Sequence, residues 1–158
     1  MNFQVIALDA AQFAPLHALD DETLAARGIV RRVVPEDGGV PCRVSLEDAR
    51  SGERVLLLPF VHHDVPTPYH ASGPIYVREN ARTARLEPGE IPAMLEKRLL
   101  SLRAYDDSHM LKESDVVEGK VLRAAIERAF ADETVAYLHL HNARPGCFNC
   151  AVERVPGA

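Results

Sequence analysis

The feature that most constrains the fold is a pair of alternating segments near the end of the chain, residues 134–142 and 148–155, with a short turn between them. In the first segment, Leu138 and Leu140 alternate with polar residues, as in a strand that buries one face. The connection contains Pro145 followed by Gly146, a pair that favours a type II turn. The two segments therefore predict an antiparallel hairpin.

A helix is expected just before this hairpin, over residues 116–131, with Asp115 as its N-cap and Glu118 reaching back to it. Its apolar stripe is Leu122, Ala125, Ile126, Ala129 and Phe130. Further strands are expected at 3–9, 29–34, 54–58, 75–78 and 100–105, with edge or bulged pairing up to Val61 beyond Pro59. Further helices are expected at 21–27 and 92–97, a helical turn between Ser45 and Gly52, and a long loop at 62–74.

These elements show no regular alternation of strand and helix. We therefore expect an α+β fold with a largely antiparallel sheet, a C-terminal hairpin and two or three packed helices. The length of 158 residues favours a single domain over residues 1–158.

Charge and apolar patterning limit the partners. The formal net charge is −5 and no block of basic residues occurs, so no nucleic-acid partner is expected. The longest apolar run, residues 55–61, is too short to cross a membrane, and the N-terminus lacks a signal-peptide pattern. We expect no membrane association, a cytoplasmic location and free thiols.

Two cysteines and two histidines of the hairpin have the composition of a tetrahedral zinc site: Cys147, Cys150, His139 and His141. Side-chain alternation argues against such a site. Matching apolar to apolar residues places Cys150, Phe148 and Val152 with the leucines, and places Cys147 and Asn149 with the histidines. Because the two thiols then point to opposite sides of the sheet, we expect no metal and no cofactor.

The polar face of the hairpin carries candidate catalytic residues. A thiol within reach of an imidazole is the minimum for an activated nucleophile, so Cys147, His139 and His141 are the candidates, with Asn149 available to orient a partner. The alternative is that this face is simply solvated. The sequence does not decide whether the protein is an enzyme.

The segment 62–74 holds a second group of polar residues. His62, His63 and His70 are alternative metal ligands, although adjacent histidines usually diverge and surface loop histidines are the commoner interpretation. Tyr69 and Tyr76 offer amphipathic walls that line a small pocket or pack a loop.

Short motifs in a fixed order resemble a bacterial protein family, the domain of unknown function 1203. They are Pro41-Cys42-Arg43-Val44-Ser45-Leu46, Gly52-Glu53, Pro68-Tyr69, Gly73-Pro74-Ile75-Tyr76 and Gly146-Cys147-Phe148. The resemblance implies a single-domain, soluble bacterial protein and supplies no activity. It also implies that Cys150 is a private feature of this chain and that the Pro-Cys-Arg segment is a candidate to converge with Cys147.

Two hypotheses of function follow. The first is a small-ligand or enzymatic pocket built from Cys42, Arg43, Tyr69, His139, His141 and Cys147, with Arg43 holding a carboxylate or phosphate. The second is a non-catalytic interaction protein that forms a homodimer or binds a protein partner through a sheet edge or a loop face. A third interpretation of Arg43 alone is that it pairs with Glu47 or Asp48 and caps a turn.

Overall fold

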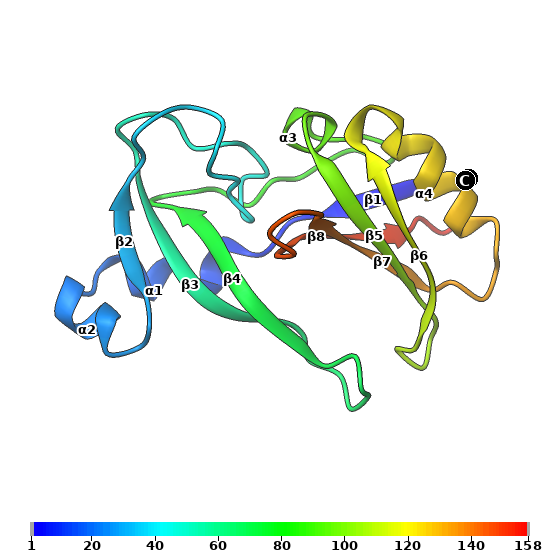
Figure 1. Cartoon of the computed structure of the whole chain (residues 1–158), viewed down its shortest axis with the longest axis horizontal. Helices are drawn as coiled ribbons and strands as arrows, with labels where there is room; N and C mark the ends of the chain where they lie inside the picture. Colours follow the sequence, from blue (N-terminus) through cyan, green and yellow to red (C-terminus); the bar gives the residue numbers. More distant parts are fainter. Residues whose placement is uncertain (1, 158) are drawn as a thin grey trace.

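Residues 2–157, which this computed structural model describes, form two antiparallel sheets that lie side by side (Figure 1). The five-stranded sheet has the order β1 (Phe3–Ile6), β8 (Phe148–Arg154), β7 (Tyr137–Asn142), β5 (Leu99–Tyr105) and β6 (Leu111–Glu118). The three-stranded sheet has the order β2 (Val30–Val33), β3 (Arg54–His63) and β4 (Ala71–Arg78). The expected α+β class with antiparallel strands is confirmed.

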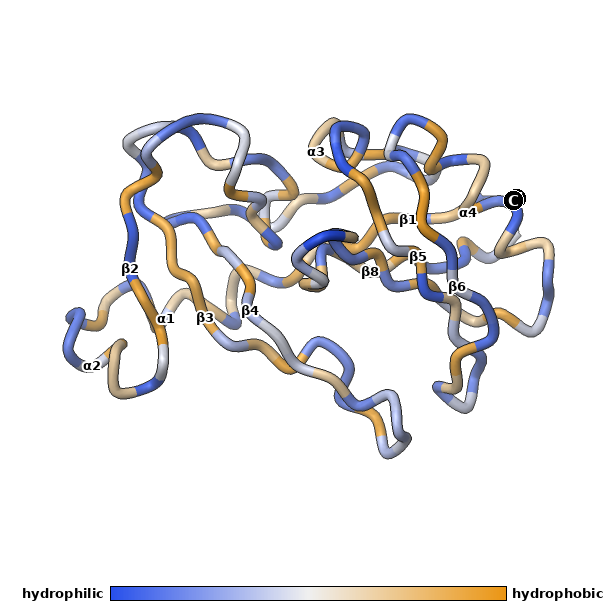
Figure 2. Tube along the Cα trace, in the orientation of Figure 1, coloured by the Kyte–Doolittle hydropathy of each residue, from blue (hydrophilic) through white to orange (hydrophobic). Residues whose placement is uncertain are grey.

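Each sheet buries one face under its own helices. The stripe of α4 (Leu122–Phe130) packs with α3 (Ala93–Glu96) on the five-stranded sheet, in a core that includes Leu138, Leu140 and Cys150. The three-stranded sheet packs against Leu24 of α2 (Asp21–Ala25) and against the segment with η1 (Ala10–Gln12) and α1 (Ala14–His17). Figure 2 shows apolar stretches in the strands of both sheets. That residues 1–158 act as one domain stays a prediction.

Several expected elements are confirmed. Asp20 caps α2 by accepting a hydrogen bond from the Thr23 amide at 2.7 Å. The hairpin of β7 and β8 turns at Pro145-Gly146, and the positive φ of 82° at Gly146 suits the expected turn.

The prediction of a long loop over 62–74 is wrong. β3 and β4 form one long hairpin in which Pro59 lies opposite Pro74, and only residues 64–70 connect them. β2 pairs with β3 no further than Leu57, so Pro59 lies in an edge segment, where proline is tolerated. The expected irregularity is present as a bulge between Val61 and His63.

Two helical predictions are also wrong. The segment after Ser45 is a tight turn closed by pairing of Pro41 with Asp48, because tertiary contacts outweigh the local capping pattern. Residues 116–118 belong to β6, and the chain passes through η2 (Gly119–Val121) before α4 begins at Leu122.

Gly119 explains this late start. A Cβ at this position would lie 2.0 Å from the Leu95 carbonyl oxygen and 2.8 Å from the Glu96 backbone. The chain can therefore turn from β6 into α4 against α3 only where a side chain is absent.

We predict that Gly119→Ala lowers the free energy of unfolding by about 3 kcal/mol, because the backbone of α3 has to move to admit the methyl group. Gly73→Ala is the control, since a Cβ there meets nothing within 4 Å. Urea denaturation of both variants measures the difference. Equal small effects of the two substitutions would show that the contact between η2 and α3 is looser than described.

Candidate functional site

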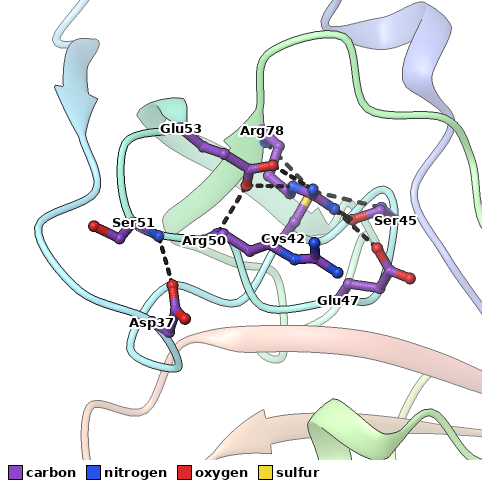
Figure 3. Close-up of polar contacts among 8 residues, drawn as sticks. All are labelled: Asp37, Cys42, Ser45, Glu47, Arg50, Ser51, Glu53 and Arg78. Atoms are coloured by element: carbon purple, nitrogen blue, oxygen red, sulfur yellow. Dashed lines mark hydrogen bonds and ion pairs between the residues drawn. The ribbon is translucent and has the colours of Figure 1, made fainter.

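The segment that carries Cys42 and Arg43 is fixed by Arg78 of β4 (Figure 3). The Arg78 guanidinium donates to both Glu53 carboxylate oxygens, at 2.9 and 2.5 Å, and to Glu47 at 2.9 Å. The Arg78 amide donates to the Cys42 sulfur at 3.3 Å. Cys42 is buried in the core of the three-stranded sheet, and the Arg78 ion pairs hold the segment that carries it. The next side chain, Arg43, therefore points away from that core, towards the β7–β8 hairpin.

Arg43 reaches from the three-stranded side to the β7–β8 hairpin. Its side chain is 1% exposed. Nε donates to the Phe148 carbonyl at 2.8 Å, Nη1 to the Pro41 carbonyl at 2.5 Å and Nη2 to the Cys147 sulfur at 3.2 Å. Burial lowers the pKa of the guanidinium, and the nearby Cys147 opposes that shift. The expected convergence of the Pro-Cys-Arg segment with Cys147 is therefore present.

The interpretation that Arg43 pairs with Glu47 or Asp48 is wrong. Glu47 pairs with Arg78, and Asp48 pairs with Arg98 at 2.5 Å. Among residues 2–157, Arg43 forms no ion pair with a carboxylate. The Arg98–Asp48 ion pair also links the two sheets, because Arg98 precedes β5 and Asp48 lies in the segment that carries Arg43. No sequence motif signalled it.

The register of the hairpin is partly as expected. Cys150 lies opposite Leu140 in the core, and His139 lies on the other face. A bulge then shifts the pairing so that Phe148 lies opposite His141. The expected place of Phe148 beside Cys150 is thus wrong, because one extra residue reverses the alternation. Asn149 donates to the Asn142 side chain at 2.9 Å instead of joining the histidines.

The three thiols have different surroundings. Cys42 and Cys150 are fully buried, and desolvation raises the pKa of Cys150 to about 12. Cys147 is half-buried. Its sulfur accepts hydrogen bonds from Arg43 and, at 3.4 Å, from the side-chain Nδ2 of Asn142. Neither of these two donors to the Cys147 sulfur is one of the histidines expected beside it. Whether His139 and His141 take part in catalysis therefore stays a hypothesis.

Histidines of β3 and β7 form the rest of the junction between the sheets. The His62 ring is stacked on Phe148, with centroids 5.2 Å apart, and lies 5.0 Å from the His141 ring. His63 packs edge-on against His139 at 4.8 Å. His139 and His141 are 6% and 1% exposed. Arg103 is the charged neighbour on β5, opposite His139.

The pKa values of these histidines are all lowered, which favours their neutral form near pH 7. Desolvation first, and then neighbouring positive charge, lowers the pKa of His139 to about 3 and those of His62 and His141 to about 4. His141 Nδ1 donates to the Gly146 carbonyl at 2.9 Å, so its Nε2 holds the lone pair and has no partner. Nδ1 of His62 and Nδ1 of His139 likewise have no hydrogen-bond partner within residues 2–157.

A chain of hydrogen bonds extends the cluster. His63 Nδ1 donates to the Tyr69 carbonyl at 2.8 Å, so its Nε2 accepts from the Tyr137 hydroxyl at 2.7 Å. The Tyr137 oxygen then accepts from His109 Nδ1 at 2.8 Å. Tyr69 therefore contributes its backbone here. His70 is exposed and lies 3.5 Å from Asp64. Within residues 2–157, no three His, Cys, Asp or Glu side chains are arranged to hold a metal.

A cleft of about 730 Å³ lies between the two sheets beside Arg43 and Cys147. Its walls include Leu57, Pro74 and Tyr76 of the three-stranded sheet and Leu99, Asn142 and the β7–β8 turn of the other. Its other charged residues are Lys97, Arg98, Arg144 and Glu118. Sequence reasoning selected Tyr76, Arg43 and Cys147 but missed Asn142, Lys97 and Arg144, which belong to no recognisable motif.

Comparisons with known proteins gave one match. A family model described as "Protein of unknown function (DUF1203)" matches residues 39–154, which is well over half of the chain. Neither the comparison with curated proteins nor that with solved structures found a match. No helix within residues 2–157 is long and apolar enough to span a bilayer.

We predict that acidification destabilises the fold through the histidine cluster. The folded pKa values lie below the unfolded value of about 6.5, so the unfolded chain binds more protons as the pH falls from 6.5 towards 4. His139 and His141 should each contribute a loss of roughly 2 kcal/mol at about pH 5. Urea denaturation at about pH 7.5 and 5 measures this loss.

The matched variants are His139→Phe, which removes a buried imidazole, and His70→Gln, which removes an exposed one. The first should reduce the difference in unfolding free energy between the two pH values. The second should change that difference much less, because His70 is exposed and makes only the smallest contribution to the lowered pKa values of His62 and His63. An identical pH dependence in wild type and His139→Phe would contradict the assignment.

The thiols should react in a fixed order. Cys147 should be alkylated first by iodoacetamide in the native protein, because burial blocks access to Cys42 and Cys150. Mass-spectrometric mapping over time measures the order. Early labelling of Cys150 would show that the hairpin register is wrong.

Proposed function

The chain belongs to the DUF1203 family, and we propose that it binds a small organic anion in the cleft between its two sheets. The observation that carries this proposal is the buried Arg43 guanidinium beside the cleft, which has no carboxylate partner within residues 2–157. A buried charge is costly unless a counter-charge or several hydrogen bonds compensate for it. An anion in the cleft supplies that counter-charge.

The donors of Arg43 support this interpretation. A guanidinium has five N–H groups. Three of them are used by Phe148, Pro41 and Cys147. One N–H of Nη1 and one of Nη2 remain, and neither has a partner within residues 2–157. Guanidinium N–H groups of this kind suit carboxylate and phosphate oxygens.

The rim of the cleft favours the same ligand class. Lys97 and Arg144 are exposed and take part in no ion pair within residues 2–157, whereas Arg98 is neutralised by Asp48. Glu118 is the one acidic residue among those that line the cleft. The excess of positive charge concentrates anions there. Leu57, Pro74 and Tyr76 add an apolar wall, so the proposed ligand has an apolar body with an acidic group.

We predict that the double variant Lys97→Ala/Arg144→Ala binds phthalate, an aromatic dicarboxylate, about fivefold more weakly than wild type. Two exposed charges contribute about 0.5 kcal/mol each, which together corresponds to that factor. NMR titration measures the affinity. Lys120→Ala/Arg27→Ala is the control, because it removes the same charge from exposed positions outside the cleft.

The neutral diamide of phthalate separates charge recognition from shape. It should shift the cleft signals far less than phthalate does. Equal affinity for both compounds, or equal weakening by both double variants, would refute the anion site.

A further inference from the structure

Cys147 is the one thiol among the residues that line the cleft. Its sulfur accepts hydrogen bonds from two fixed donors, Arg43 at 3.2 Å and Asn142 at 3.4 Å. Both donors are more than nine-tenths buried, so neither can swing away easily. A thiolate accepts such hydrogen bonds better than a thiol does, and a guanidinium adds charge attraction. The sulfur therefore lies at the cleft with a guanidinium fixed beside it.

No other thiol of the described residues is placed to react with Cys147. Cys150 is fully buried in the core of the five-stranded sheet, and Cys42 is buried in the core of the three-stranded sheet. All three cysteines are free thiols, and Cys147 is the least buried of them. A disulfide at Cys147 therefore needs a sulfur that enters through the cleft.

The cleft selects which sulfur compound enters. Its volume of about 730 Å³ accommodates a small molecule, and Lys97, Arg144 and Arg43 outnumber the single acidic residue in its lining. A disulfide that carries carboxylates is attracted to this lining, whereas a neutral or cationic disulfide gains nothing from it. The same charges that support anion binding thus also act on the reactant.

We infer that Cys147 undergoes thiol–disulfide exchange with small anionic disulfides that bind in the cleft. This inference rests on the proposed anion-binding function. The Cys147 thiolate attacks one sulfur of the bound disulfide, a new bond forms to Cys147 Sγ, and the S–S bond of the ligand breaks. The other half leaves as a thiolate and takes a proton from water. Cys147 is oxidised and the ligand is reduced, so no further oxidant is needed.

The adduct changes the contacts of Arg43. The sulfur of a mixed disulfide carries no negative charge, so it is a poorer acceptor for Nη2 than a thiolate. The Arg43 donor released in this way lies beside the newly attached group. A carboxylate on that group can then act as the counter-charge of the guanidinium.

The test compares two disulfide reagents on the native protein. 5,5′-Dithiobis(2-nitrobenzoate) carries two carboxylates, and 4,4′-dithiodipyridine carries no charge near neutral pH. The measured quantity is the rate constant of the dicarboxylate reagent at Cys147 divided by that of the uncharged reagent. This ratio should fall about fivefold in Lys97→Ala/Arg144→Ala. The ratio should not change in the control pair Lys120→Ala/Arg27→Ala, and Cys147→Ser should form no mixed disulfide in the native state.

Reaction at Cys42 or Cys150 instead of Cys147, or the same ratio in both double variants, would overturn the inference. Phthalate titration distinguishes failure of anion binding from failure of thiol–disulfide exchange. If phthalate binds as expected while the ratio is unchanged, exchange at Cys147 is refuted and anion binding stands. If phthalate does not bind and the ratio is unchanged, both proposals are refuted.

Discussion

The guanidinium of Arg43 is the interaction on which the arrangement of the two sheets depends. It is a buried cation whose acceptors are two backbone carbonyls and a sulfur, contributed by both sides of the junction. Loss of one acceptor from such a group leaves a desolvated charge, which is costly. The ion pairs of Arg78 and Arg98 hold the segment that presents it, so three arginines determine where the cleft and Cys147 lie.

The histidine cluster is the second part of the junction, and it works in a different way. Rings of β3 pack on rings of β7 and β8 as aromatic groups, and three of the ring nitrogens have no partner in the described part of the chain. Neutral imidazoles pack much as other small aromatic rings do. Because protonation would place charge on buried imidazoles near Arg103, acidification weakens the junction.

The sequence predicted features that depend on local pattern. Alternation placed Cys150 in the core, and the stripe from Leu122 to Phe130 identified the buried face of α4. It could not predict the bulge at Phe148, since one inserted residue leaves no mark in a short alternating segment. It also could not show that the strands divide between two sheets, or that Gly119 lies against α3, because both depend on contacts between distant segments. Arg43 and Cys147 were selected, but their contact spans 104 positions.

The central claim is that Arg43 is held at the junction by acceptors from both sheets. The exchange rate of its Nε–H proton with water tests this claim most directly. It is measured by ¹H–¹⁵N NMR, and the signal is assigned by its loss in Arg43→Lys. The account predicts exchange far slower than at the exposed Arg27, because this proton is donated to the Phe148 carbonyl in a buried site. Equal exchange rates at Arg43 and Arg27 would contradict it.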